Sequence, residues 1–224
     1  MKQLFLSGGG SAEDSQLLDK KFVSLIEPGQ RLLYIPIAWQ NDLEQCRTWI
    51  TPILSQLGIS DFEMWKDVEN KSYEDITVFG AIYIGGGNTF SLLNDLQKTG
   101  FIELLKKFID SGRPVYGGSA GAIILGKDIA TAALGEKPDK DIVGMSDTQA
   151  LDLVKNYAIH CHYVSADDQR INDFIAKTGM SVLALSEKNG VYVAGEELHV
   201  VGFEPTYLFT GSEKKVFEPS TLII

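Results

Sequence analysis

The chain is poor in cysteine. Its 224 residues include only two, Cys46 and Cys161. Two cysteines cannot build the disulfide framework that holds small secreted domains together, and a chain of this length buries enough apolar surface to fold without one. The cysteine content therefore fits a reducing compartment, and we expect a cytoplasmic protein.

Positive charge and long apolar runs are also scarce. The chain has 20 Lys and Arg against 30 Asp and Glu, a net charge of −10, and no basic cluster long enough to follow a nucleic-acid backbone. No apolar run reaches the length of a transmembrane helix, and residues 1–7 lack the apolar region of a signal peptide. We therefore expect no nucleic-acid partner and no membrane partner.

Short apolar runs alternate with segments of helical periodicity over the first half of the chain. The runs that predict strands are residues 4–6, 32–35, 61–65, 81–84 and 115–116. The segments that predict helices are residues 13–26, 43–57, 90–97 and 101–111. Strands that are apolar throughout are typical of a parallel sheet covered on both faces. We therefore expect a single α/β domain over residues 1–224, with three layers and a mostly parallel sheet.

The pattern changes after residue 122. Residues 157–164 and 182–185 predict two further strands with a helix at 167–178 between them. Four short apolar runs then follow in quick succession, punctuated by Gly195, Gly202 and Gly211. This spacing predicts antiparallel hairpins at the edge of the sheet.

Ser119 lies at the centre of a turn of small residues, Gly-Gly-Ser-Ala-Gly-Ala, that follows the strand at 115–116. With Gly117 and Gly121 it forms the G-x-S-x-G pattern of a nucleophile elbow. Glycine tolerates the strained backbone of such a turn and leaves room beside the serine. An ordinary tight turn with an incidental serine would have the same sequence, so the pattern makes Ser119 a candidate nucleophile only.

A nucleophilic serine needs a base, and a third group must orient that base. The chain has three histidines, His160, His162 and His199. On a strand, His160 and His162 would point to the same face, so either could be the base. His199 lies among the predicted hairpins and is expected at the surface.

Three acidic residues are candidates for the orienting group. Glu187 follows the strand at 182–185, which places it at the carboxyl edge of the predicted sheet. Asp128 and Asp147 are alternatives. A glutamate in a solvated hairpin turn would have the same sequence context as Glu187.

A second glycine turn, Gly85-Gly86-Gly87, follows the strand at 81–84. Because the carboxyl ends of parallel strands share one sheet edge, this turn can face Ser119 across a crevice. An oxyanion hole needs two N–H donors, and Ala120 could supply one while Gly86 or Gly87 supplies the other. The turn matches neither G-x-G-x-x-G nor a Walker loop.

The two turns together resemble the peptidase E (aspartyl dipeptidase) and cyanophycinase family of serine peptidases. The resemblance rests on Ile-Gly-Gly-Gly-Asn-Thr-Phe at residues 84–90 and Gly-Ser-Ala-Gly-Ala at residues 118–122. It implies a glutamine-amidotransferase-like, flavodoxin-like sheet and a Ser-His-Glu triad. In the family the histidine precedes an aromatic residue, as His162 precedes Tyr163, and the glutamate lies in a segment like residues 185–190. The resemblance therefore selects His162 over His160 and favours Glu187.

The chain also departs from the family pattern. Peptidase E has Trp just before the nucleophile and Asn after the elbow, where this chain has Gly118 and Ile123. We expect a wider site and at most a moderate preference for an N-terminal aspartate. Arg170 could hold a substrate carboxylate, as an arginine does in aspartyl dipeptidase, or it could be a solvated helix residue. Asn88 is a second candidate substrate-binding residue.

Two other functions compete with a serine peptidase for short peptides. One is a catalytically silent or amidotransferase-like binding domain, although amidotransferases of this fold use cysteine at the elbow. The other is a metal site at residues 160–162, which is disfavoured because Cys161 would point away from both histidines on a strand. We expect no cofactor and no metal, and the chain could act as a homodimer.

Overall fold

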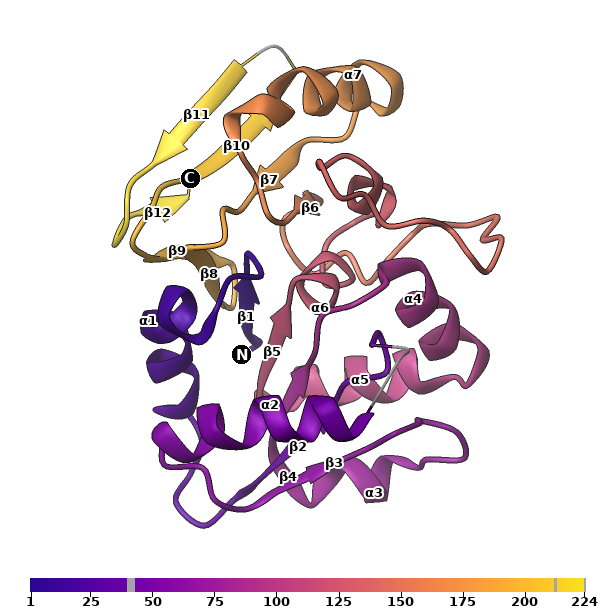
Figure 1. Cartoon of the computed structure of the whole chain (residues 1–224), viewed down its shortest axis with the longest axis vertical. Coiled ribbons are helices and arrows are strands. Elements are labelled where there is room, and N and C mark those ends of the chain that lie inside the picture. The colour runs from indigo at the N-terminus through magenta and orange to yellow at the C-terminus, as the bar shows by residue number, and fades with distance from the viewer. Residues whose placement is uncertain (40–42, 212, 224) are drawn as a thin grey trace.

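The computed structural model describes residues 1–39, 43–211 and 213–223 (Figure 1). Within them, the largest sheet has eight strands in the order β12-β9-β8-β1-β5-β4-β2-β3. Its parallel part comprises β1 (Gln3–Ser7), β5 (Pro114–Gly118), β4 (Phe79–Ile84), β2 (Arg31–Ile35) and β3 (Phe62–Met64). The parallel strands predicted from the apolar runs are therefore confirmed.

Antiparallel strands extend this sheet beyond β1. They are β8 (Asn189–Ala194), β9 (Glu197–Gly202) and β12 (Leu222–Ile223). The β8–β9 hairpin is the predicted edge hairpin, and it leaves β1 enclosed between β5 and β8.

Helices cover both faces of the main sheet. Those of the first half of the chain are α1 (Ala12–Val23), α2 (Leu43–Gln56), α3 (Tyr73–Thr77), α4 (Thr89–Lys98), α5 (Phe101–Asp110) and α6 (Ala120–Ile123). Phe5 packs in one apolar cluster with side chains of α1 and α2, whereas Leu4 and Leu6 pack in another with α4 and α5. This alternation follows from the two-residue repeat of a strand. The predicted three-layer α/β fold is confirmed.

A second, four-stranded sheet lies in the upper part of Figure 1, in the order β11-β10-β7-β6. Its strands are β6 (Ala158–His160), β7 (Val182–Ala184), β10 (Thr206–Thr210) and β11 (Glu213–Phe217), and α7 (Asp168–Thr178) packs against it. The sequence placed all hairpins at the edge of one sheet, but β10–β11 belongs to this second sheet. There β10 pairs with β7, whereas β8 pairs with β1 in the main sheet. Both sheets contribute side chains to one apolar cluster, and the single domain over residues 1–224 stays a prediction.

The strand predicted at residues 157–164 ends early. β6 stops at His160, and His162 has a left-handed backbone with φ of 56°. The His162 N–H donates to the Gly8 carbonyl at 2.9 Å, which turns the chain out of the sheet. The two histidines therefore do not share a face, and that prediction was wrong.

His160 lies in a buried network that joins β6 to α7. Its ring nitrogens lie 3.2 Å from the Thr131 carbonyl oxygen and 3.2 Å from Asp167 Oδ2. Arg170 donates to the other oxygen of the same carboxylate at 3.0 Å. His160 is 2% exposed, and this burial lowers its pKa despite the nearby Asp167.

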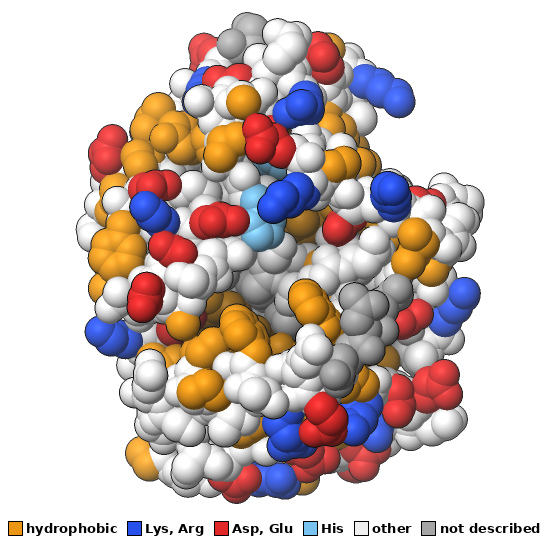
Figure 2. Space-filling view, in the orientation of Figure 1, with side chains coloured by type: hydrophobic (Ala, Val, Ile, Leu, Met, Phe, Trp, Pro, Cys, Tyr) orange, Lys and Arg blue, Asp and Glu red, His pale blue; other side chains and the backbone are white. Residues whose placement is uncertain are grey.

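The face of the molecule seen in Figure 1 is hollowed near its middle (Figure 2). Among the described helices, none combines the length and apolar character needed to cross a membrane.

The turn after β5 has no room for two side chains. A Cβ on Gly117 would overlap the Gly121 carbonyl group, and a Cβ on Gly121 would overlap the Ile84 carbonyl oxygen. The elbow glycines therefore let α6 approach β4 and β5 closely.

We predict that Gly121→Ala lowers the free energy of unfolding by roughly 1–3 kcal/mol, the usual cost of overpacking. Urea denaturation measures the change. Gly118→Ala is the matched control, because its Cβ would meet its nearest neighbour, the Tyr83 hydroxyl, at an ordinary 3.5 Å. Equal losses in the two variants would contradict the packing argument.

Acid should destabilise the fold through His160. A histidine in the unfolded chain has a pKa of about 6.5, and burial lowers the pKa of His160 below that value in the folded chain. The unfolded chain therefore binds the proton first, so stability that is complete above about pH 6.5 is lost as the pH falls. His160→Gln should show a shallower loss between about pH 7 and pH 5 than wild type. His199→Gln is the control, and equal slopes for the two variants would sink the assignment.

Candidate active site

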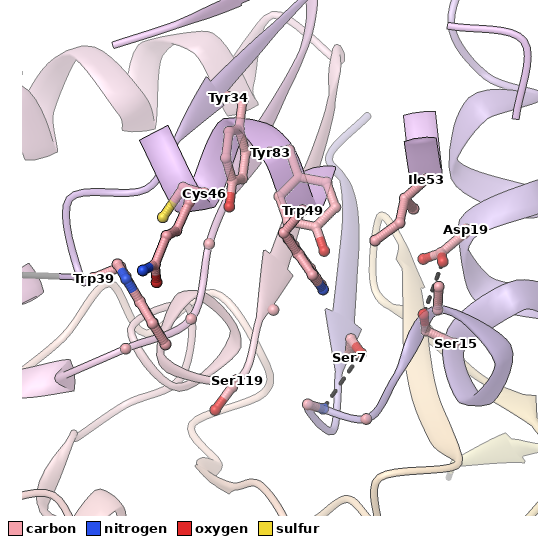
Figure 3. A pocket seen from close by; sticks show the side chains of 18 of the residues that line it. Ser7, Ser15, Asp19, Tyr34, Trp39, Cys46, Trp49, Ile53, Tyr83 and Ser119 are labelled. Atoms are coloured by element: carbon pink, nitrogen blue, oxygen red, sulfur yellow. Dashed lines mark hydrogen bonds between the residues drawn. The ribbon is translucent and has the colours of Figure 1, made fainter. Parts of the chain in front are cut away.

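Ser119 occupies a sharp turn between β5 and α6 (Figure 3). Its backbone angles are φ 48° and ψ −108°, a region that non-glycine residues seldom adopt. The turn is held from both sides, since the Ser119 N–H donates to the Ser7 carbonyl at 3.2 Å and its carbonyl accepts from Ala122 and Ile123. The helix that follows the turn, α6, is short and ends at Ile123.

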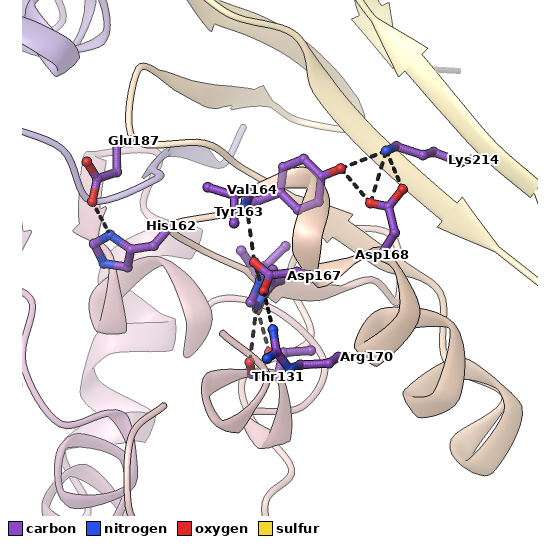
Figure 4. Close-up of polar contacts among 11 residues, drawn as sticks. Thr131, His162, Tyr163, Val164, Asp167, Asp168, Arg170, Glu187 and Lys214 are labelled. Carbon is purple, nitrogen blue, oxygen red and sulfur yellow. Dashed lines mark hydrogen bonds and ion pairs between the residues drawn. The ribbon is translucent and has the colours of Figure 1, made fainter. Parts of the chain in front are cut away.

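A chain of hydrogen bonds runs from Ser119 to an acid. Ser119 Oγ lies 2.8 Å from His162 Nε2. His162 Nδ1 lies 2.9 Å from Glu187 Oε1, and Figure 4 shows this second contact. Because a carboxylate only accepts, the imidazole proton belongs on Nδ1, and Nε2 is left to accept from the serine hydroxyl. This arrangement lets the imidazole take the serine proton.

Backbone pairing across β6 and β7 sets the position of Glu187. The Leu185 N–H donates to the His160 carbonyl at 2.8 Å, and the Tyr163 N–H donates to the Leu185 carbonyl at 3.0 Å. His162 lies between His160 and Tyr163, just after the end of β6, and Glu187 lies two residues beyond Leu185. The Glu187 and His162 side chains are 58% and 47% exposed, so water reaches this ion pair.

The glycines at residues 8–10 form the opposite wall of the site. A Cβ on Gly8 would overlap the Ser186 carbonyl, and one on Gly10 would overlap the Glu187 carbonyl. Gly9 has φ of 100°, and its Cβ would overlap the His162 ring. The predicted site did not include these glycines, although three consecutive glycines after a buried strand are the signal of such a close approach.

The remaining histidines lie elsewhere. His160 is bound in the buried network below β6 and makes no hydrogen bond to Ser119. His199 lies on β9, where it pairs with Glu197 at 3.3 Å and stacks on Tyr192.

The two alternative acids accept hydrogen bonds from residues near them in the sequence or in the same loop. Asp128 accepts hydrogen bonds from the Ala130 N–H and the Thr148 hydroxyl, and Asp147 accepts from the Gln149 N–H. Of the three candidates, Glu187 is the one hydrogen-bonded to His162.

The two glycine turns face each other, as the sequence predicted. A Cβ on Gly86 would lie 3.3 Å from Ser119 Cβ. Gly87 has φ of 140°, and its Cβ would overlap the Ala38 carbonyl of the next loop. The N–H groups of Gly86, Gly87 and Ala120 donate to no residue in the described part of the chain. They are therefore available as donors, and their role as an oxyanion hole stays a prediction.

The two predicted substrate-binding residues have structural partners. Arg170 donates to the buried Asp167 carboxylate and leaves half of its own side chain exposed. Asn88 caps α4 by accepting from the Ser91 N–H, and its amide donates to the Lys140 carbonyl. Neither residue lines the cavity that contains Ser119. Their roles toward substrate stay predictions.

That cavity has a volume of about 460 Å³ and contains Ser119 and His162. Its walls carry four aromatic side chains, Tyr34, Trp39, Trp49 and Tyr83 (Figure 3). Trp49 is 50% exposed, and α2 buries Cys46, Ile50 and Leu54.

Cys161 lies behind the elbow, where its thiol contacts the Ser7 and Ser119 carbonyls, and burial raises its pKa. In the described residues, no group of three or more His, Cys, Asp or Glu side chains could hold a metal ion.

Comparison with known proteins places this geometry among peptidases. The sequence model of Peptidase family S51 matches residues 4–201. Peptidase E of Shewanella denitrificans (strain OS217) is 31% identical over 140 residues, which cover 61% of this chain and 60% of the relative. Peptidase E of Shewanella baltica (strain OS185) is 27% identical over 201 residues, which cover 84% and 80%. The chain thus spans about 60% of the length of the first of these curated relatives.

Two solved structures share the fold. A candidate peptidase E protein from Listeria monocytogenes EGD-e is 27% identical, with a TM-score of 0.71 over 90% of this chain and 98% of its own. A peptidase from an acI-B1 Actinobacterium has a TM-score of 0.78 over 100% of this chain and 96% of its own, and at 18% identity it supports the fold alone. The resemblance drawn from the two glycine turns is confirmed. Because the family match extends over residues 4–201, the chain belongs to peptidase family S51.

Proposed function

We propose that this protein is a serine peptidase that hydrolyses short peptides. Ser119 is the nucleophile, His162 the general base and Glu187 the residue that orients His162. The observation that carries this proposal is the continuous hydrogen-bond chain through the three side chains, which starts at a serine held on a strained turn. Membership of peptidase family S51 supports the same reaction class.

The geometry suits acyl transfer. As Ser119 Oγ attacks the peptide carbonyl, its proton passes to His162 Nε2, and a tetrahedral intermediate forms with a negative oxygen. The N–H of Ala120 and that of Gly86 or Gly87 stabilise this oxygen. His162 then gives the proton to the leaving amine as the C–N bond breaks. Water repeats the sequence on the acyl-enzyme, releases the acid and restores Ser119.

Because Glu187 is exposed to solvent, its electrostatic contribution to catalysis is limited. An exposed ion pair is screened, so its electrostatic stabilisation of a protonated His162 is modest. Its main contribution is to keep the imidazole proton on Nδ1 and the ring aimed at Ser119.

We expect Ser119→Ala to lose about 10³-fold or more in kcat, since removing the nucleophile leaves only residual catalysis. Hydrolysis of a dipeptide panel measures this, and an unchanged melting temperature is the control for folding. A fluorophosphonate probe should label Ser119 in the wild-type protein and nothing in the variant. A wild-type protein that neither reacts with the probe nor cleaves the panel would instead be the catalytically silent binding domain.

The two neighbouring histidines should separate activity from stability. His162→Ala should abolish turnover with little change in the free energy of unfolding, because its side chain is half exposed. His160→Gln should lower the melting temperature, because it breaks a buried network, yet retain turnover when assayed below that temperature. If His160→Gln inactivates a folded protein and His162→Ala does not, the assignment of the base is reversed.

A further inference from the structure

The cavity beside Ser119 reaches helix α1, which carries a buried carboxylate. Asp19 lines the cavity together with Ser15, although its exposed fraction is only 5%. Asp19 Oδ2 accepts from the Ser15 hydroxyl at 2.8 Å. Figure 3 shows this pair on the cavity side of α1.

The other carboxylate oxygen faces no cation. Within the described residues, Asp19 Oδ1 has no donor at full hydrogen-bond distance, and the carboxylate forms no ion pair. Burial raises the pKa of Asp19, and the neutral hydroxyl groups of Tyr116 and Ser15 lower it to a smaller extent. A buried carboxyl group without a cation is costly unless its partner comes from outside the chain.

Aromatic rings surround the same space. Burial, and after it the charge of Asp19, raise the pKa of Tyr83 and Tyr116, so both phenols stay neutral beside the carboxylate. Trp39 and Trp49 border the cavity and are 44% and 50% exposed, which is unusual for side chains of this size. Aromatic faces attract cations, most strongly where water is excluded.

Gly118 borders the cavity that contains both Ser119 and Asp19. It lines the cavity, and a Cβ there would point toward the Tyr83 hydroxyl at 3.5 Å. Gly118 is not among the glycines with positive φ, so its backbone would accept a side chain. Any larger side chain at this position would occupy the space between the nucleophile and the carboxylate.

We propose that this cavity is a specificity pocket for a cationic side chain of the peptide substrate, lysine or arginine, with Asp19 as its counter-charge. The proposal rests on the proposed peptidase function and names its substrate class. Aromatic walls contact the aliphatic stem and the charged head, and the ammonium or guanidinium group donates to the Asp19 carboxylate. The net charge of −10 favours the approach of such a ligand. A preference for acidic residues through Arg170 would draw on a guanidinium that already pairs with Asp167.

The test uses peptides that differ only in charge. Arginine is compared with citrulline, and lysine with norleucine, on either side of a bond to leucine. For wild type, kcat/KM should favour the charged member at least tenfold at one of the two positions. In Asp19→Asn this ratio should fall to near one, with the neutral peptide as the internal reference. Glu13→Gln, which removes a charge from an exposed position of the same helix, should keep the wild-type ratio.

A second variant tests the pocket by filling its space while Asp19 is kept. Gly118→Leu should lose the preference for the charged member, because its side chain would occupy the passage while Asp19 remains. The melting temperature of Asp19→Asn should equal or exceed that of wild type, since the variant no longer buries a lone carboxyl group. A large drop in melting temperature with an unchanged ratio would mean that Asp19 is structural and would overturn the proposal.

The outcomes separate the pocket from the reaction. Equal cleavage of arginine and citrulline peptides by wild type overturns the pocket and leaves the peptidase intact. If the protein cleaves nothing, the peptidase proposal fails, and calorimetry on Ser119→Ala then decides the pocket. If Ser119→Ala binds the arginine peptide and the double variant Ser119→Ala/Asp19→Asn does not, the pocket proposal is supported. If Ser119→Ala does not bind the peptide, the pocket proposal is overturned.

Discussion

Two consecutive carbonyl groups at the end of β1 hold the site in place. The Ser7 carbonyl accepts from the Ser119 N–H, and the Gly8 carbonyl accepts from the His162 N–H. Both donors have positive φ, 48° and 56°, and each such backbone costs about 1–3 kcal/mol unless its surroundings enforce it. β1 is itself enclosed between β5 and β8, so these carbonyls cannot shift without disturbing two strand pairings. The strain of the two turns is therefore offset by the stiffest part of the sheet.

Features that depend on local pattern could be predicted from the sequence. The parallel strands follow from short apolar runs, and their order brings the two glycine turns to one sheet edge. Gly86 faces Ser119 for this reason. The choice of His162 came from the resemblance to a family, because a strand pattern by itself left His160 equivalent.

Features that depend on distant contacts could not be predicted. The reversal at His162 is imposed by Gly8, which is remote in sequence, so the alternation of a strand gave the wrong geometry there. Asp19 precedes Lys20 and Lys21 and has the sequence context of a solvated helix residue, yet the packing of α1 against the sheet buries it. The second sheet was missed because nothing in the sequence of β10 tells which edge it joins. In each case the sequence did not show which distant segment the residue or strand would contact.

The position of β1 between β5 and β8 also determines when, during synthesis of the chain, the site can form. β1 is made first during synthesis, but its neighbours β5 and β8 end at residues 118 and 194. Glu187 emerges just before β8, and the Gly8 N–H is bonded to the Asn189 carbonyl at the start of that strand. A growing chain on the ribosome therefore has Ser119 well before it has Glu187 and the paired strand β8 that follows it. The order of synthesis delays assembly of the Ser119–His162–Glu187 hydrogen-bond chain until residues 187–194 have been made.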